Sequence, residues 1–373
     1  MPRSMSRRQW FRRSGAAAAG LALAPQLATA ASPLTIPARP ANGLIRLSSN
    51  ENPYGPSAAA RKAMQAAFDE SWKYPYAGAA SDFIDLIAER EGVTPEHVIL
   101  GGGSSEILHA TGLAYGLHGG ELLAANPTYE GMPRYAGKVA GYTHRVPLTD
   151  ALEHDLEAME GRITQAVKLV FVCNPNNPTG TIVDAAALRD FVTTAARKAV
   201  IFVDEAYIEL TDDPAANTMV DLVRKDHNVI VSRTMSKIYG MAGLRVGYAL
   251  ARPDLAERVR TYGMAGPNVV GLRGAIASLQ DDAFREHSLS QMRKGRHVIY
   301  DLCNEMGRQH AQSQTNFVFF HTGMPVRDFQ AAMYNEGIMV GRAFPPYLDW
   351  ARVSVGTDED MAAFATAFRK VMS

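Results

Sequence analysis

Short runs of apolar, largely β-branched residues recur along the middle of the chain and alternate with stretches of helical spacing. The runs occupy residues 98–100, 121–125, 169–173, 200–203, 229–231 and 248–250. Apolar runs this short are typical of strands that are buried on both faces of a mostly parallel sheet. The pattern therefore predicts an α/β fold with a large, doubly wound, mostly parallel sheet.

The pattern changes after Pro267. It predicts a long helical stretch at 272–307, followed by shorter elements at 317–320, 326–336, 338–340, 352–355 and 358–371. We interpret this part as a smaller C-terminal α+β domain at 266–373, after a large domain at 57–265. Residues 31–56 are rich in Pro, Asn and Gly and are expected to form an irregular N-terminal arm, with one short apolar stretch at 44–47.

The first 30 residues differ from the rest. A basic start is followed by an Ala-rich, weakly apolar run and by Ala28-Thr29-Ala30, which fits a signal cleavage site. The segment Ser6–Phe11 (SRRQWF) resembles the twin-arginine export motif. We expect residues 1–30 to be a signal peptide that directs a folded protein to the periplasm; the alternative is a disordered basic tail. The apolar run is too short for a stable membrane span.

Charge and cysteine content exclude several classes of function. The 373 residues contain 38 Lys and Arg against 38 Asp and Glu, so a nucleic-acid-binding surface is not expected. Cys173 ends an apolar run and Cys303 lies in a helical stretch, which favours thiols in a hydrophobic core. No cluster of Cys and His has zinc-site spacing, so no metal is expected.

Polar residues follow the carboxyl end of each expected strand of the large sheet. They are Gly101–Ser105, Asn126–Tyr129, Asn174–Gly180, Asp204–Tyr207 and Arg233–Lys237. Because the carboxyl ends of parallel strands meet at one edge, where α/β proteins bind ligands, these segments predict a single site.

These segments, with others in the same order, resemble the class I/II aminotransferases of fold-type I, and within them the histidinol-phosphate aminotransferase branch. The matching segments are Leu47–Pro56, Tyr74-Pro75, Gly103–Glu106, Pro127–Tyr129, Asn174–Gly180, Asp204–Tyr207, Ser236–Gly247 and Arg352–Thr357. They span nearly all of the chain after the expected signal. The resemblance implies a pyridoxal 5'-phosphate enzyme that moves an amino group between an amino acid or amine and a 2-oxo acid. It also implies a homodimer with shared active sites.

Lys237 is the residue that this resemblance makes the covalent anchor of the cofactor and the carrier of the substrate's α-proton. A lysine that does this must lose its own proton, which burial beside cations promotes. The resemblance pairs Asp204 with the cofactor's ring nitrogen. It makes Tyr207 and Asn177 hydrogen-bond donors to the phenolic oxygen. Without the resemblance, Asp204 reads as a helix N-cap and Asn177 as a turn residue.

A second group is expected to hold the cofactor's phosphate and ring. Residues 103–105 lie where a glycine loop opens a helix, so the backbone N–H groups of Gly103, Ser104 and Ser105 can face an anion. The resemblance adds further residues to this group. Thr234, Ser236 and Arg245 are phosphate ligands, Tyr129 stacks on the ring, and Tyr74 reaches the phosphate from the other subunit.

The substrate side of the site is expected to contain Arg352 and Asn52. By resemblance, Arg352 grips the substrate's carboxylate through a two-pronged contact. The family's second arginine usually follows the strand at 338–340 directly, but here that position is Gly341 and Arg342 comes one residue later. Arg342 therefore either still binds a substrate phosphate or faces away, leaving Phe344 and Tyr347 to shape an apolar pocket.

Two other functions remain open at this point. The chain also resembles threonine-phosphate decarboxylases, which use the same cofactor; released carbon dioxide would distinguish them. A catalytically inactive periplasmic binding protein is the second alternative, and a folded protein without a cofactor absorption band would favour it.

Overall fold

The computed structural model describes residues 43–75, 78–117, 119–139 and 141–373. The expected signal peptide and its Ser6–Phe11 motif lie outside the described residues. All elements discussed below belong to one unit, Arg39–Ser373.

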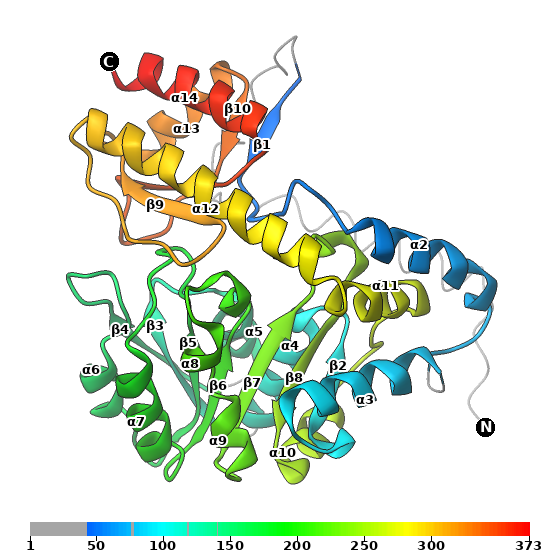
Figure 1. Cartoon of the computed structure of the whole chain (residues 1–373). Helices are drawn as coiled ribbons and strands as arrows, with labels where there is room; N and C mark the ends of the chain where they lie inside the picture. The colour runs from blue at the N-terminus through cyan, green and yellow to red at the C-terminus, as the bar shows by residue number, and fades with distance from the viewer. Residues whose placement is uncertain (1–42, 76–77, 118, 140) are drawn as a thin grey trace, which may run out of the picture. The chain divides into compact units, whose positions relative to one another are not determined.

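A seven-stranded sheet forms the larger part of this unit (Figure 1). Its strands, in spatial order, are β2 (Val98–Gly101), β8 (Gly247–Ala251), β7 (Val229–Thr234), β6 (Val200–Asp204), β5 (Val167–Cys173), β3 (Glu121–Asn126) and β4 (Thr143–Pro147). Only β8 runs antiparallel to its neighbours. All six apolar runs identified in the sequence are strands of this sheet, so the expected α/β class is confirmed.

Edge strand β4 was not expected from the sequence. Its residues read THRVP, and Val146 is its only buried residue. An edge strand that pairs on one side only and stays half solvated does not need the apolar run that marks the inner strands.

Helices cover both faces of the sheet. On one face lie α4 (Ser104–Gly116), α5 (Gly131–Val139) and α10 (Pro253–Arg260); on the other lie α3 (Ala79–Glu91), α6 (Leu156–Glu160), α7 (Ala185–Ala195), α9 (Val220–Arg224) and α11 (Val269–Leu279). Strand β6 shows how the two cores are separated: Ile201 and Val203 pack into one cluster, Val200 and Phe202 into the other. This alternation produces the doubly wound arrangement.

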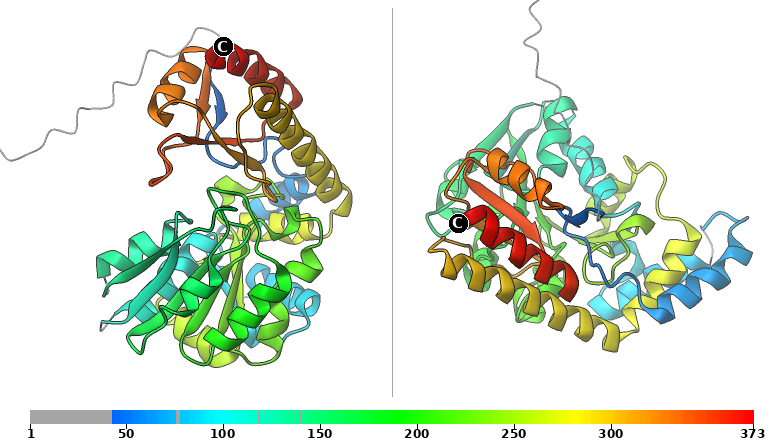
Figure 2. Two further views of the ribbon diagram at one scale, coloured as in Figure 1. Left: turned by 90° about the vertical axis from the view of Figure 1, so that its left-hand side faces the viewer. Right: turned by 90° about the horizontal axis from the view of Figure 1, so that it is seen from above.

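The C-terminal elements build a second layer around a separate hydrophobic cluster (Figure 2). They are β9 (Phe317–His321), β10 (Ile338–Val340), β11 (Trp350–Ser354), α12 (Asp282–Glu305), α13 (Val326–Asn335) and α14 (Asp358–Met372). Strand β11 pairs antiparallel with β9. The short apolar stretch of the N-terminal arm forms β1 (Ile45–Leu47), which pairs in parallel with β10. The remaining elements are α2 (Ala58–Ala67), α8 (Pro214–Asn217) and the 3-10 helices Phe68–Glu70, Pro95–His97, Ile208–Leu210 and Ala242–Leu244.

The helical stretch expected at 272–307 is two helices, not one. Helix α11 ends at Leu279 and α12 begins at Asp282. The side chain of Asp281 accepts a hydrogen bond from the backbone N–H of Phe284 at 3.0 Å. Asp at this position caps a new helix, which is the local signal for a break that apolar periodicity alone does not show.

The direction of the strands decides where a site can form. Strands β2, β3, β5, β6 and β7 all point the same way, so their carboxyl ends meet at one edge. Cys173 is paired with Asp204 across β5 and β6, and Asp204 with Ser232 across β6 and β7. Within the described ranges, no helix is long and apolar enough to cross a bilayer.

Candidate active site

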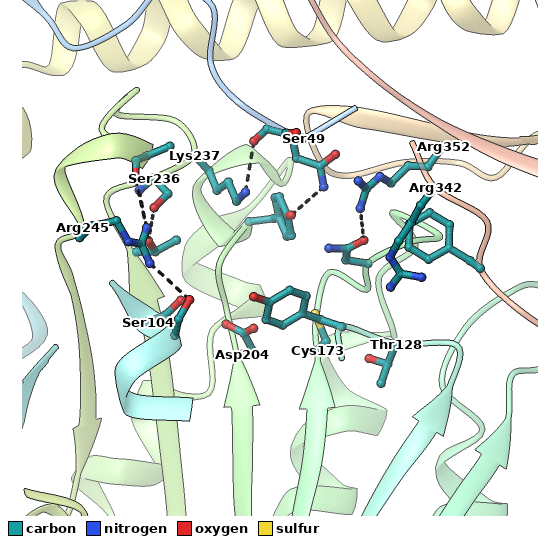
Figure 3. A pocket seen from close by; sticks show the side chains of 18 residues that line it. Ser49, Ser104, Thr128, Cys173, Asp204, Ser236, Lys237, Arg245, Arg342 and Arg352 are labelled. Atoms are coloured by element: carbon teal, nitrogen blue, oxygen red, sulfur yellow. Dashed lines mark hydrogen bonds between the residues drawn. The ribbon is translucent and has the colours of Figure 1, made fainter. Parts of the chain in front are cut away.

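A cavity of about 330 Å³ lies at this carboxyl edge and brings together most of the residues expected from the sequence. Twelve of the fifteen line it: Ser104, Ser105, Tyr129, Asn177, Asp204, Tyr207, Thr234, Ser236, Lys237, Arg245, Arg342 and Arg352. In Figure 3, Arg245 and Ser104 lie on one side, Arg342 and Arg352 on the other, and Lys237 between them. The cavity therefore presents cationic groups at both ends of a reactive amine.

Three expected residues do not line the cavity. Gly103 is the N-cap of α4, with φ +76°. A Cβ there would lie 2.3 Å from an Nη atom of Arg245, so a glycine at this position leaves room for the Arg245 guanidinium. Asn52 is buried and donates to the carbonyl of Ile238 at 2.7 Å, which fixes the arm instead. Tyr74 is 80% exposed on this chain.

Lys237 is the third residue after β7, and its Nζ donates to the backbone carbonyl of Asn50 at 3.2 Å. Burial, and then the nearby positive charge of Arg352, lowers the pKa of Lys237 from 10.5 to about 8. Its Nζ lies 5.3 Å from the centre of the Tyr207 ring. A lysine with this pKa has an appreciable neutral fraction at neutral pH, as a nucleophilic amine requires.

Asp204 ends β6 and is only 2% exposed. Ser232 donates to its Oδ1 at 2.9 Å from the neighbouring strand. Burial nevertheless raises the pKa of Asp204 from 3.8 to about 6. A buried carboxylate with a raised pKa is stabilised by any cationic group bound beside it, which suits the protonated nitrogen of an aromatic ring.

A group of anion-binding residues lies at the end of the cavity near α4. We refer to Ser104, Ser105, Thr234, Ser236 and Arg245 as the anion cup. Arg245 adopts a left-handed backbone conformation at φ +55°, and its Nη2 donates to Ser105 Oγ at 3.3 Å. Thr234 donates to Ser236 Oγ at 2.9 Å. The first turn of α4, with its free N–H groups, begins at Ser104. A guanidinium, hydroxyl groups and a helix N-terminus together fit a phosphate.

Arg352 lies at the opposite end and is 8% exposed. Its Nη1 donates to Asn177 Oδ1 at 2.6 Å and its Nη2 to the carbonyl of Ser48 at 2.8 Å. Its Nε is buried and has no hydrogen-bond partner among the described residues. Burial lowers the pKa of Arg352 to about 10. The structure describes no carboxylate paired with this arginine among residues 43–75, 78–117, 119–139 and 141–373. A buried guanidinium with an unused donor is suited to an anionic ligand.

Arg342 shares an aromatic platform with Arg352. The guanidinium carbons of Arg342 and Arg352 lie 4.2 and 4.9 Å from the centre of the Phe344 ring. The two cations thus meet at one ring, and we refer to Arg342, Phe344 and Arg352 as the arginine clamp. Arg342 lines the cavity, and its Nη1 donates to the carbonyl of Ala343 at 2.8 Å.

Gly341 explains why an arginine is not found directly after β10. Its N–H donates to the carbonyl of Arg352 at 2.8 Å, and a Cβ at Gly341 would lie only 2.6 Å from that oxygen. The close approach of these two backbones disfavours a side chain at 341, and the second cation at this end of the cavity is Arg342.

Asn50 is a residue that the sequence analysis did not select. Its backbone is left-handed at φ +54°, and its Nδ2 donates to Tyr207 Oη at 3.0 Å. Its N–H donates to Ser354 Oγ at 2.8 Å, and this hydroxyl donates back to Asn50 Oδ1 at 2.9 Å. Asn tolerates this backbone region better than most residues. Its position in the arm motif was visible in the sequence, but its contacts with β11 were not.

The comparison with known proteins agrees with this geometry. The family model for aminotransferase class I and II matches residues 42–368. The chain belongs to this family. It is 35% identical over 334 residues to a histidinol-phosphate aminotransferase from Moorella thermoacetica, covering 88% of this chain and 86% of the relative. A relative of the same name from Halalkalibacterium halodurans is 34% identical, covering 88% and 89%.

A solved structure supports the fold and the cofactor. The histidinol-phosphate aminotransferase from Sinorhizobium meliloti, in complex with pyridoxal-5'-phosphate, superposes with a TM-score of 0.80 at 26% identity. The alignment covers 88% of this chain and 90% of that one. This protein is therefore a fold-type I, pyridoxal-phosphate-dependent aminotransferase, as its sequence predicts.

The cavity offers a matching residue for each polar group of pyridoxal phosphate. The anion cup would hold the phosphate, Asp204 the ring nitrogen, and Tyr207 and Asn177 the phenolic oxygen. When bound, the cofactor supplies an electron sink for the bond broken at the substrate's α-carbon. The protein's own contribution is to present a neutral amine at Lys237 and to keep a negative charge at Asp204.

Proposed function

We propose that this aminotransferase takes its amino group from a donor with a terminal anionic group, with histidinol phosphate as the first candidate, and transfers it to a 2-oxo acid. The observation that carries this proposal is the arginine clamp, in which a buried guanidinium keeps an unused donor beside a second arginine. The names of the relatives, at 34–35% identity over most of the chain, support the choice of histidinol phosphate.

A side cavity of about 250 Å³ supports the same donor class. It shares Thr128, Arg342 and Phe344 with the main cavity. Arg342 and Phe344 therefore border additional space, and a tetrahedral phosphate needs more room than a planar carboxylate.

Steady-state kinetics with two clamp variants test this proposal. Arg342→Gln should raise KM for histidinol phosphate about ten-fold or more while changing KM for the 2-oxo acid less, because a charged contact to the phosphate is lost. Arg352→Lys should impair both half-reactions, since an ammonium cannot replace a two-pronged fork. Unchanged kinetics for histidinol phosphate in Arg342→Gln would remove Arg342 from the proposal.

An aromatic amino acid is a second candidate donor. Phe344 lines the cavity. Its ring stands edge-on to the ring of Phe319, with 6.2 Å between the ring centres. This aromatic wall favours an aromatic side chain over a small one. Comparing kcat/KM for histidinol phosphate, phenylalanine and tyrosine separates the two candidates.

The decarboxylase alternative has weaker support. The L-threonine-O-3-phosphate decarboxylase from Porphyromonas gingivalis has a TM-score of 0.75 but is 17% identical, which is a likeness of fold alone. We expect no carbon dioxide release from threonine phosphate. Its stoichiometric release would favour the decarboxylase.

We also propose a homodimer that shares its active sites. Aromatic side chains stand exposed after α2: Phe68 at 64%, Trp72 at 80% and Tyr74 at 80%. A second subunit covering them would place Tyr74 near the neighbouring anion cup. Mixing a Tyr74→Phe protein with a Lys237→Ala protein should then restore part of the activity. A confirmed heterodimer without restored activity would contradict shared sites.

We further propose export to the periplasm, on the basis of Ser6–Phe11 and Ala28–Ala30. Replacing Arg7 and Arg8 with Lys should keep the protein in the cytoplasm. An unchanged periplasmic yield would refute the export proposal without affecting the enzymatic one.

A further inference from the structure

We propose that the edge of the sheet opposite the active site carries a second anion site, which takes a small ligand with several phosphate groups. A cavity of about 850 Å³ opens there, lined near Lys168 at the start of β5, near Val200 at the start of β6 and near Arg252 just after β8. Strand β6 has five residues and separates the two edges by roughly 16 Å. The cavity is therefore distinct from the site around Lys237.

The charge of the cavity is opposite to that of the protein around it. Among the residues that the structure describes, its titratable lining consists of five cations and one carboxylate, together with Tyr115: Lys168, Arg197, Lys198, Arg252 and Arg258 against Asp254. Over the whole chain, basic and acidic residues balance, but six of the arginines precede residue 43, where no acidic residue occurs. The remaining chain has an excess of six acidic residues. A basic cavity in an acidic body attracts anions locally.

Only part of this positive charge is neutralised by neighbouring carboxylates. Arg252 holds Asp254 through two contacts, at 2.7 and 3.0 Å, and Lys198 lies 3.7 Å from Glu160. Within the described ranges, Lys168, Arg197 and Arg258 form no ion pair. Their charges are therefore available to a ligand.

The C-terminal ends of nearby helices neutralise a smaller share of the cavity's positive charge. Helices α4 and α7 end at this edge, and each helix C-terminus carries roughly half a negative charge. Arg258 interacts with the negative end of α4 by donating to the carbonyl of Ala114 at 2.8 Å. Lys168 instead donates to the loop carbonyl of Gln165 at 2.7 Å. Counting Asp254 and Glu160 against the five cations leaves an excess of three, and about one unit of dipole charge does not offset it.

Tyr115 adds a polar group that is not satisfied by the protein. Its ring lies under Arg258, with the guanidinium carbon 4.3 Å from the ring centre, and the residue is 6% exposed. Its buried hydroxyl has no hydrogen-bond partner in the described part of the chain. A buried hydroxyl without a partner destabilises the protein, and a ligand oxygen beside Arg258 would provide one.

The size and lining indicate the class of ligand. The cavity is larger than the 330 Å³ active-site cavity, so it has room for more than one phosphate. Arginine forks and lysine ammonium groups together match tetrahedral oxyanions. We therefore assign it to a polyphosphate or a small molecule bearing two or more phosphates.

Titration calorimetry with inorganic tripolyphosphate tests this site in the cofactor-loaded enzyme, so that the anion cup is already filled. The test variant is Lys168→Gln with Arg197→Gln. The matched control is Lys62→Gln with Arg327→Gln, which removes two exposed cations elsewhere. We expect saturable one-to-one binding to the wild type and the control, weakened about ten-fold or more in the test variant.

Two results would overturn the proposal: no saturable binding to the wild type, or equal weakening in both variants. Equal weakening would mean that tripolyphosphate responds only to overall charge. Should the double variant melt well below the wild type, Arg197→Gln alone replaces it, with about three-fold weaker binding expected. Retained wild-type affinity in this folded single variant would likewise reject the site.

Discussion

The backbone carbonyl of Asn50 accepts a hydrogen bond from the Nζ of Lys237 at 3.2 Å, across 187 positions of sequence. The same residue donates through its side chain to Tyr207. An arm residue thus contacts both the reactive amine and the phenol beside it. Ser354, in strand β11, fixes the position of Asn50 through hydrogen bonds to its backbone N–H and its side-chain oxygen.

The first prediction separates the two functions of Asn50. Asn50→Asp keeps the shape, the tolerance for a left-handed backbone and the oxygen that accepts from Ser354, but it loses the donor to Tyr207. It also places a negative charge near Lys237, which raises the pKa of that amine. We expect the pH titration of the cofactor's visible band to shift upward and kcat to fall about ten-fold.

Ser354→Ala is the control for Asn50→Asp. It removes the anchor of Asn50 but leaves the donor to Tyr207, so it should destabilise the protein by about 1 kcal/mol with a smaller spectral shift. Equal spectral shifts in the two variants would mean that Asn50 acts only through the fold.

The second prediction concerns the anchor itself. Lys237→Ala should abolish the cofactor's covalent absorption band and reduce turnover by on the order of 10³-fold or more. Circular dichroism and the melting curve verify that the fold is retained. Turnover within a factor of ten of the wild type would exclude Lys237 as the catalytic amine.

The third prediction follows from the lowered pKa of Lys237. The neutral amine is the reactive form, so the rate at which cofactor-free protein captures pyridoxal phosphate should rise with pH and level off above about 8. An ordinary lysine would give a rate still rising near pH 10. Arg352→Gln removes a positive charge that lowers this pKa, so the midpoint should move to higher pH.

The fourth prediction concerns Gly341. A Cβ at this position would press on the carbonyl of Arg352 at 2.6 Å, so Gly341→Ala should destabilise the protein by about 1–3 kcal/mol and raise KM for the anionic donor. Gly137→Ala is a suitable control, because the nearest atom to its added Cβ lies 3.9 Å away. Similar melting temperatures for both variants would contradict the backbone contact.

Much of the fold and of the cavity lining was predictable because it depends on local sequence. The inner strands are buried on both faces and have continuous apolar runs, and polar residues follow each of them. The twelve expected lining residues lie in segments of this kind or in short family motifs. Edge strand β4 and the break at Asp281 were missed because they depend on one-sided pairing and on a single capping side chain.

The remaining features depend on contacts between segments that are distant in sequence. Asn50 and Asn52 look alike in the motif, and only packing against Ser354 and Ile238 shows that Asn50 faces the cavity. The role of Gly341 depends on how closely it approaches Arg352, which no local pattern encodes.

The most direct test of the central claim is the visible absorption spectrum of the purified, cofactor-loaded protein during titration with histidinol phosphate in the absence of a 2-oxo acid. We predict that the band disappears in a saturable manner and returns when a 2-oxo acid is added, because each half-reaction uses the same lysine. A folded protein that binds no pyridoxal phosphate would contradict the catalytic account. A band unaffected by any amino donor would also contradict it.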